Sequence, residues 1–247
     1  KKLSQNNNFF SAIIECKNQI ICISDFCRSF PFFYYKDGDS FIVSNNARIL
    51  QKELQLNKIE KESIYECFLS GYVSGKKTLY KNLFQAEVLK FLKFNKSTKK
   101  LSENYYYFYH KKIIPNIEKK DALLKLDKVI ENSINRLIRK ADNRTIIIFM
   151  SGGLDSRLII SKLVERGYKK ILAYSYGLPG NSDSKIASEV CKKLNVKWEH
   201  ICISKIDYDD LFNKNNVINY IRFSDGLSTV PNFQDFFPLS KLKLRLK

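Results

Sequence analysis

The sequence lacks the features that mark membrane, zinc-binding and disulfide-bonded proteins. No apolar run is long enough to span a membrane, and the chain opens with two lysines and a polar stretch instead of a secretory signal peptide. There are two histidines and six cysteines, and no two cysteines form a Cys-x-x-Cys pair. Neither histidine lies at metal-ligand spacing from a cysteine, which disfavours a zinc site. We therefore expect a cytoplasmic protein with reduced cysteines and no membrane partner.

Arginine is scarce relative to lysine, and this affects how the charge is interpreted. The net charge of +18 invites a nucleic-acid-binding function. However, the lysines are spread along the whole chain, and specific nucleic-acid readers use arginine for bidentate contacts. We interpret the charge as a solvated basic surface and expect no nucleic-acid partner.

The first hundred residues are β-rich. Glycine- and polar-rich turns separate short apolar or alternating segments, which is typical of strands joined by hairpins. We assign residues 1–112 to this first domain. The predicted strands are 9–15, 20–25, 31–35, 40–44, 87–94 and the aromatic run 105–109, and the predicted helices are 46–56 and 62–69.

The second part of the chain, 113–247, alternates between strands and helices. Its first helix runs from Asp121 to about residue 140, with an apolar stripe. The alternation that follows is a βαβαβ unit, which implies a parallel, doubly wound sheet with right-handed crossovers. The predicted strands are 145–150, 170–175 and 197–204, and the predicted helices are 155–166 and 183–194.

The most informative segment is Ser-Gly-Gly-Leu-Asp-Ser at 151–156, directly after a predicted buried strand. A strand, glycine turn and helix aim free backbone N–H groups and the helix dipole at one point, where a phosphate can bind. Gly152 and Gly153 let the backbone approach the anion, and Ser151 and Ser156 add hydroxyl groups. A carboxylate beside an anion site, Asp155, indicates a metal ion. The segment is not a Walker A loop, which needs a Gly-Lys-Ser/Thr end.

Residues 174–183 form a second predicted junction between a strand and a helix. The backbone near Ser175 and Gly177 could meet the edge of an adenine base. An ordinary strand-to-helix loop, capped by Ser182 or Asp183, is the alternative that the residues leave open.

Segments 151–156, 174–183 and 187–201 resemble the synthetase domain of glutamine-dependent asparagine synthetases, which is of the ATP pyrophosphatase type. Segments 25–35, 41–47 and 68–79 resemble the glutaminase-type domain of the same family. The resemblance implies an α/β protein: a β-rich α+β glutaminase-like domain followed by a doubly wound parallel-sheet domain like the adenine nucleotide alpha hydrolases. It also implies an ATP-dependent ligase that forms an acyl-adenylate, releases pyrophosphate and then makes an amide.

The resemblance assigns ATP and Mg²⁺ as cofactors and gives roles to particular residues. Pyrophosphate and metal would be held by the segment Ser151, Gly152, Gly153, Leu154, Asp155 and Ser156, with Leu154 as its variable position and Asp155 on the metal. Ser175 and Gly177 would lie beside the adenosine, and no catalytic residue is assigned. The expected partners are a small carboxylate, either aspartate or a sugar acid, and an ammonia or glutamine donor. A homodimer is left open.

The sequence also departs from the family's pattern. It opens with Lys1-Lys2 where the family has a cysteine nucleophile, and no Gly-Glu-Gly-x-Asp-Glu-like acidic loop occurs before Lys247. We therefore expect both domains to be incomplete and glutamine hydrolysis to be absent. Two other functions stay open: a non-catalytic nucleotide-binding remnant and a tRNA-modifying ATP pyrophosphatase.

Overall fold

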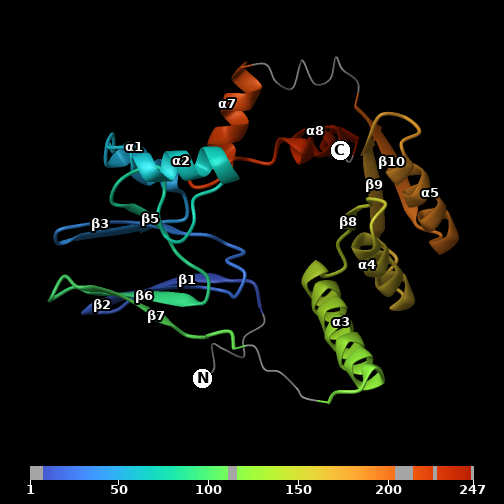
Figure 1. Cartoon of the computed structure of the whole chain (residues 1–247), viewed down its shortest axis with the longest axis horizontal. Helices are drawn as coiled ribbons and strands as arrows, with labels where there is room; N and C mark the ends of the chain where they lie inside the picture. The colour runs from blue at the N-terminus through green and yellow to red at the C-terminus, as the bar shows by residue number, and fades with distance from the viewer. Residues whose placement is uncertain (1–7, 111–115, 204–213, 225–226, 246–247) are drawn as a thin grey trace. The chain divides into compact units, whose positions relative to one another are not determined.

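The computed structural model describes residues 8–110, 116–203, 214–224 and 227–245. The chain divides into two compact units (Figure 1). The first comprises residues 1–111 with 214–232, and the second comprises residues 112–213 with 233–247. Within the described residues, no helix combines the length and apolar character needed to cross a membrane.

The first unit contains two antiparallel sheets. One has the order β1-β2-β6-β7 and the other the order β4-β3-β5. Apolar side chains of both sheets share one buried cluster, built on Cys22, Phe32, Tyr34, Ala86 and Leu92. The strands are β1 (Ser11–Glu15), β2 (Gln19–Ser24), β3 (Phe33–Asp37), β4 (Ser40–Ser44), β5 (Leu83–Gln85), β6 (Lys90–Asn95) and β7 (Leu101–Tyr105).

Helices α1 (Ala47–Glu53) and α2 (Lys61–Ser70) follow the β3–β4 hairpin. The side chain of Asn46 caps α1 by accepting hydrogen bonds from the backbone N–H groups of Arg48 (2.9 Å) and Ile49 (3.2 Å). Helix α2 ends at Gly71, whose φ of 82° is left-handed, as the sequence predicted.

The aromatic run 105–109 was predicted to be a strand, and that prediction is wrong beyond its first residue. The strand is β7, which ends at Tyr105. Strand β7 starts at Leu101, earlier than the predicted strand 105–109. It can start there because the Asn95 side chain closes a tight turn by accepting hydrogen bonds from the backbone N–H groups of Ser97 and Thr98, both at 2.9 Å. Tyr106 instead donates its hydroxyl to the Ser24 carbonyl at 2.8 Å.

A late segment of the chain completes the first unit. Helix α7 (Lys214–Phe223) belongs to that unit, as do the residues up to 232. Leu227 is 4% exposed and packs with Phe33, Ala47, Leu50 and Leu83. Backbone bonds join Val73 N to Ser228 O (2.7 Å) and Val230 N to Gly71 O (2.7 Å). The sequence predicted one second domain over residues 113–247. In the structure, residues 214–232 belong to the first unit, where Leu227 is buried.

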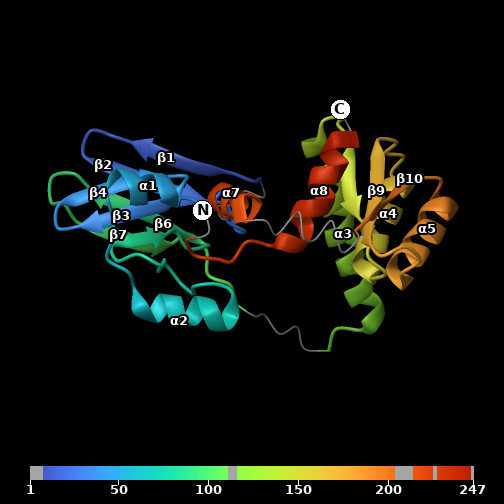
Figure 2. The same ribbon diagram turned by 90° about the horizontal axis from the view of Figure 1, so that it is seen from above.

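The second unit contains a parallel sheet of β8 (Ile146–Phe149), β9 (Ile171–Gly177) and β10 (Lys197–Cys202), in the order β10-β9-β8. Helices α4 (Leu154–Glu165) and α5 (Ser182–Leu194) connect the strands, which confirms the predicted βαβαβ unit. Helix α8 (Phe233–Arg245) covers the opposite face from α4 and α5 (Figure 2). In the described sheet, the order of the strands follows the sequence from β8 through β9 to β10. The predicted doubly wound sheet contains a reversal of strand order, which these three strands do not show.

Helix α3 (Lys119–Ala141) packs beside α4, but only part of its predicted apolar stripe is buried. Ile134 is 5% exposed within the core, whereas Leu123 and Leu126 are each 54% exposed. Charged side chains join the two helices: the Lys162 ammonium lies 2.7 Å from a Glu131 carboxylate oxygen, and Arg166 also pairs with Glu131. These contacts fix the position of α3 on the face that α4 and α5 cover.

Candidate functional site

The predicted glycine turn lies at the carboxyl end of β8. Met150 is fully buried, and its backbone N–H donates to the Tyr174 carbonyl of β9 at 2.7 Å. The chain then turns through residues 151–153, and Gly153 forms the N-cap of α4. The strand, glycine turn and helix predicted from the sequence are therefore present in the structure.

The turn leaves backbone donors available at the start of α4. Its N-cap residue is a glycine, which has no side chain to cap the helix, and the first-turn N–H groups have no acceptor within the helix itself. The Ser156 hydroxyl lies 3.4 Å from the Ser151 carbonyl, and the Gly153 N–H donates to the Ser151 hydroxyl at 3.3 Å. An anion at this point would meet several N–H groups and the positive end of the helix dipole.

Arg157 stabilises the conformation of the turn through hydrogen bonds to its backbone. Its guanidinium donates to the carbonyl of Gly153 (Nε, 3.1 Å) and to the carbonyl of Gly152 (Nη2, 3.1 Å). Both glycine carbonyls are thereby engaged, and two fixed hydrogen bonds hold the conformation of the loop.

A side chain at Gly152 would require Asp183 to move. A Cβ atom there would lie 2.6 Å from Asp183 Oδ1 and 3.4 Å from Ile186 Cδ1. Asp183 belongs to the first turn of α5, so the glycine allows the starts of α4 and α5 to approach one another.

A cavity of about 420 Å³ opens at the carboxyl ends of β8 and β9. Ligands of parallel α/β sheets bind at this edge. Ser175 and Gly177, which were predicted to lie beside the adenosine, are among the residues that line the cavity. Asp183 also lines it and lies close to Gly152. Residues 151–156 are not among its lining residues, which are Phe149, Met150, Ser175, Tyr176, Gly177, Leu178, Asn181, Ser182 and Asp183.

Two of these residues, Phe149 and Tyr176, were missed by the sequence reasoning. Their rings are stacked, with centroids 4.9 Å apart and planes 20° apart. Phe149 is 39% exposed, so the pair presents a flat aromatic surface at the cavity. Phe149 lies next to the end of predicted strand 145–150, and Tyr176 directly follows predicted strand 170–175. Their position where two adjacent parallel strands end was the signal that could have identified them.

Ser175 and Gly177 contribute to the cavity in different ways. Ser175 is 1% exposed, and its hydroxyl accepts a 2.7 Å hydrogen bond from the Trp198 indole N–H. Gly177 has a φ of +124°, which side-chain-bearing residues rarely adopt, and this conformation turns the chain out of β9. Any contact that Ser175 makes with a ligand therefore involves mainly its backbone.

Helix α5 follows this loop and is capped by Asn181, not by Ser182 or Asp183. The Asn181 side chain accepts from the Ser184 N–H at 2.8 Å and donates to the Leu178 carbonyl at 2.8 Å. Ser182 and Asp183 stay exposed in the first turn of α5, beside the cavity. Their polar groups are available to a ligand.

Asp155, the predicted metal ligand, lies in the first turn of α4. No group of three or more histidine, cysteine, aspartate or glutamate side chains suited to a metal occurs among the described residues. Mg²⁺ is commonly held by one or two carboxylates, water and the phosphate oxygens of a substrate. Asp155 fits that pattern, with most ligands coming from a bound nucleotide.

Comparison with known proteins matches residues 125–219 to the asparagine synthase family. A protein of Methanocaldococcus jannaschii provisionally named asparagine synthetase (glutamine-hydrolysing) 2 is 26% identical over 214 residues, covering 85% of this chain and 41% of its own length. The microcin J25-processing protein McjC of Escherichia coli is 30% identical over 215 residues, covering 84% of this chain and 36% of its own length. The chain therefore spans about two fifths of the length of these relatives.

Among solved structures, a glutamine-dependent NAD⁺ synthetase of Acinetobacter baumannii in complex with ADP aligns with 86% of this chain and 53% of its own. The identity is 12% and the TM-score is 0.32, which is too low to indicate a shared fold. The assignment depends on the sequence matches, and these cover the glycine turn and the cavity. The chain contains an ATP pyrophosphatase domain of the asparagine synthetase family.

Proposed function

We propose that the chain is part of an ATP-dependent ligase that activates a carboxylate by adenylation and converts it to an amide. The observation that carries this proposal is the glycine turn at the end of β8, beside the cavity at the ends of β8 and β9. That geometry would give a phosphate group and an adenine base neighbouring places to bind. The family match of residues 125–219 supports the same chemistry.

The proposed roles follow from the donors available at each end of the site. The first-turn N–H groups of α4, with Ser151 and Ser156, would bind the pyrophosphate portion of ATP. The stacked pair Phe149 and Tyr176, with the backbone near Gly177, would receive the adenosine. Bound ATP supplies an electrophilic phosphorus atom and a pyrophosphate leaving group. The chain's contribution would be to position these groups and neutralise their charge.

Mg²⁺ would bind between Asp155 and the phosphate oxygens. The carboxylate of Asp183 lies close to Gly152 and would repel a polyphosphate unless a cation neutralised part of the charge. The acceptor carboxylate, aspartate or a sugar acid, stays a proposal, as does the ammonia or glutamine donor. The proposed setting is cytoplasmic.

The direct test is ATP binding with and without Mg²⁺, measured by calorimetry on the wild type and on Asp155→Asn. Asp121→Asn is a matched control, since Asp121 also lies in the first turn of a helix of the same unit. We expect Asp155→Asn to weaken Mg²⁺-dependent binding by roughly tenfold or more, equivalent to about 1.4 kcal/mol. Equal binding by both variants would contradict the assignment of Asp155.

A non-catalytic nucleotide-binding protein is the second candidate. Both functions predict ATP binding, so the distinguishing measurement is pyrophosphate release in the presence of ammonium and candidate carboxylates. Acceptor-dependent release would support the ligase, whereas binding without release would favour the non-catalytic function. The tRNA-modifying alternative predicts release that depends on added tRNA.

A further inference from the structure

We propose that the first unit binds a small polyanion, with two or more phosphate groups, in a cavity between its two sheets. The cavity has a volume of about 510 Å³. Small-molecule sites typically measure roughly 300–1,000 Å³. It lies where strand β7 of one sheet faces β3 and β5 of the other, and it is lined by Tyr34, Lys36, Lys76, Phe84, Lys99, Lys100, Leu101 and Glu103.

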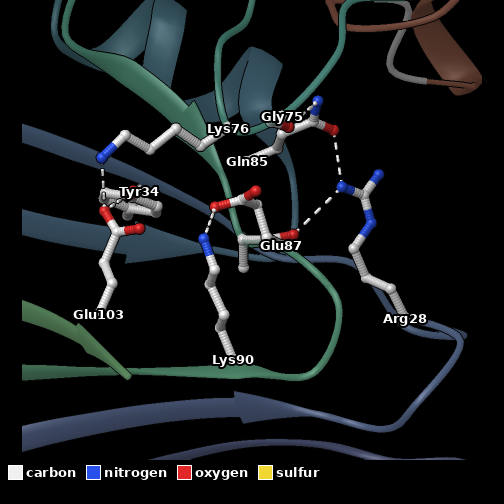
Figure 3. Close-up of polar contacts among 9 residues, drawn as sticks. Arg28, Tyr34, Gly75, Lys76, Gln85, Glu87, Lys90 and Glu103 are labelled. Atoms are coloured by element: carbon white, nitrogen blue, oxygen red, sulfur yellow. Dashed lines mark hydrogen bonds and ion pairs between the residues drawn. The ribbon is translucent and has the colours of Figure 1, made fainter. Parts of the chain in front are cut away.

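The lining has a large excess of positive charge. Four lysines line the cavity and Glu103 is the one carboxylate among the lining residues. Glu103 is already engaged: its Oε1 lies 2.7 Å from the Lys76 ammonium and accepts a 3.0 Å hydrogen bond from the Tyr34 hydroxyl (Figure 3). The other three lysines therefore have no carboxylate partner within this lining.

These three lysines also lack ion pairs elsewhere in the described parts of the chain. The Lys36 ammonium donates to the carbonyl of Gly38, and Lys99 and Lys100 lie in the exposed turn before β7. The Asn95 side chain fixes this turn through the N–H groups of Ser97 and Thr98. Three ammonium groups around one cavity give it a net attraction for negative charge.

The lysine-rich composition does not by itself explain this arrangement. Neither the cavity at the ends of β8 and β9 nor the cavity that Arg28 lines in the first unit has a lysine among its lining residues. A uniform basic surface would place lysines around each of these cavities. Their concentration in one cavity points to a specific site.

The floor of the cavity is apolar and well packed. Tyr34 is 1% exposed and stacks on Phe84, with ring centroids 5.2 Å apart. Burial, together with the nearby Glu103 carboxylate, raises the pKa of Tyr34, so its hydroxyl stays protonated and continues to donate to Glu103. The Lys76 ammonium lies 5.7 Å from the centre of the Phe84 ring. Charges beside such a low-dielectric surface interact more strongly than charges in bulk water.

The types of cation indicate the chemical class of the ligand. Lysine ammonium groups act as point charges and bind phosphate without requiring planar geometry. No arginine lines the cavity, so the bidentate fork that matches carboxylates and phosphates alike is missing from it, and binding would depend on charge. Three separated ammonium groups best match a compact ligand with several phosphate charges.

The test uses the full chain and inorganic tripolyphosphate as the probe, followed by backbone amide NMR shifts. We expect saturable shifts at residues 99–103 that weaken with added salt. Shifts at residues 151–156 would report the proposed ATP site separately, so failure of either proposal can be recognised alone. Absence of saturable shifts at residues 99–103 would overturn the inference.

Two variants are expected to change the affinity in opposite directions. Lys99→Gln with Lys100→Gln should weaken binding at residues 99–103 about tenfold, since hydrogen bonds to charged groups contribute this much. Glu103→Gln should tighten it, because the repelling charge is lost while the amide oxygen can still accept from Tyr34 and Lys76. The matched control is Lys17→Gln with Lys58→Gln, two exposed lysines outside the cavity. Equal weakening by the control would show that the charge acts non-specifically. Weaker binding in Glu103→Gln would show that Glu103 does not repel the ligand. Either result would overturn the site.

Discussion

The indole N–H of Trp198 donates a 2.7 Å hydrogen bond to the hydroxyl of Ser175, which joins β10 to β9 beneath the candidate nucleotide cavity. Ser175 is 1% exposed, so water cannot readily replace the indole as its partner. Trp198 is also the one tryptophan of the chain. Its fluorescence therefore reports the second unit.

Trp198→Phe should lower the free energy of unfolding of the second unit by about 1–3 kcal/mol, because the buried Ser175 hydroxyl loses its donor and the smaller ring packs less well. Urea unfolding followed by circular dichroism measures the change. In a double-mutant cycle, adding Ser175→Ala to Trp198→Phe should cost less than Ser175→Ala costs in the wild type. Strict additivity of the two changes would argue that the hydrogen bond contributes nothing.

Gly152→Ala should impair ATP binding with little effect on stability. The new Cβ would lie 2.6 Å from Asp183 Oδ1, and rotation of that carboxylate relieves most of the clash. The free energy of unfolding should change by less than about 1 kcal/mol. The affinity for ATP·Mg should fall roughly tenfold, because the methyl group and the displaced carboxylate occupy the phosphate side of the loop. Unchanged affinity would count against Gly152 as part of the anion site.

The second unit should lose stability in acid because the Glu131 carboxylate becomes protonated. Hydrogen bonds from Lys162 and Arg166 hold the pKa of Glu131 below its usual value of 4.5. A carboxyl group with a lowered pKa in the folded state contributes stability above its unfolded pKa, and this contribution is lost as the pH falls through the folded pKa. Glu131→Gln should therefore be less stable than the wild type at pH 6, with the difference shrinking as the pH falls below about 4.5.

The control for this pH dependence is Glu189→Gln on α5, whose carboxyl group has no ion pair in the described structure. Its unfolding curves should follow those of the wild type at every pH. A difference between Glu131→Gln and the wild type that stays constant from pH 6 to pH 3 would show that the helix contact does not depend on the Glu131 charge.

Leu227→Ala should destabilise the first unit although residue 227 follows the second unit's sheet in the sequence. The side chain is 4% exposed among Phe33, Leu50 and Leu83, and buried Leu→Ala changes cost about 2–5 kcal/mol. Leu242→Ala is the matched control, because Leu242 is 2% exposed in the second unit beside Leu172 and Ile201.

Two buried thiols report the units separately. Cys22 lies in the first unit's core and Cys191 in the second, and burial raises the pKa of Cys22 to about 12 and raises the pKa of Cys191 as well. Each thiol should react with a labelling reagent mainly when its unit unfolds. Leu227→Ala should speed labelling of Cys22, and Leu242→Ala should speed labelling of Cys191. The reverse pattern would contradict the division into units.

Much of the second unit could be predicted from its sequence alone. The apolar run ending at Met150, the glycine pair at 152–153 and the apolar periodicity of α4 each specify local backbone geometry, so the strand, turn and helix needed no distant contact. The same holds for α5, although the residue that caps it is Asn181 and the sequence favoured its neighbours. Local signals also gave the β3–β4 hairpin, where Gly38 adopts a positive φ of 48°.

Tertiary structure alone decided which distant residues meet. Three arrangements bring together residues far apart in the chain. Leu227 packs with Phe33, and Asp183 lies close to Gly152. One cavity is lined by Lys36, Lys99 and Lys100. The stacked pair Phe149 and Tyr176 comes from adjacent strands whose register is fixed by backbone pairing. Such contacts depend on how sheets, helices and loops pack to bury apolar surface, and residue patterns along a single chain do not encode them locally.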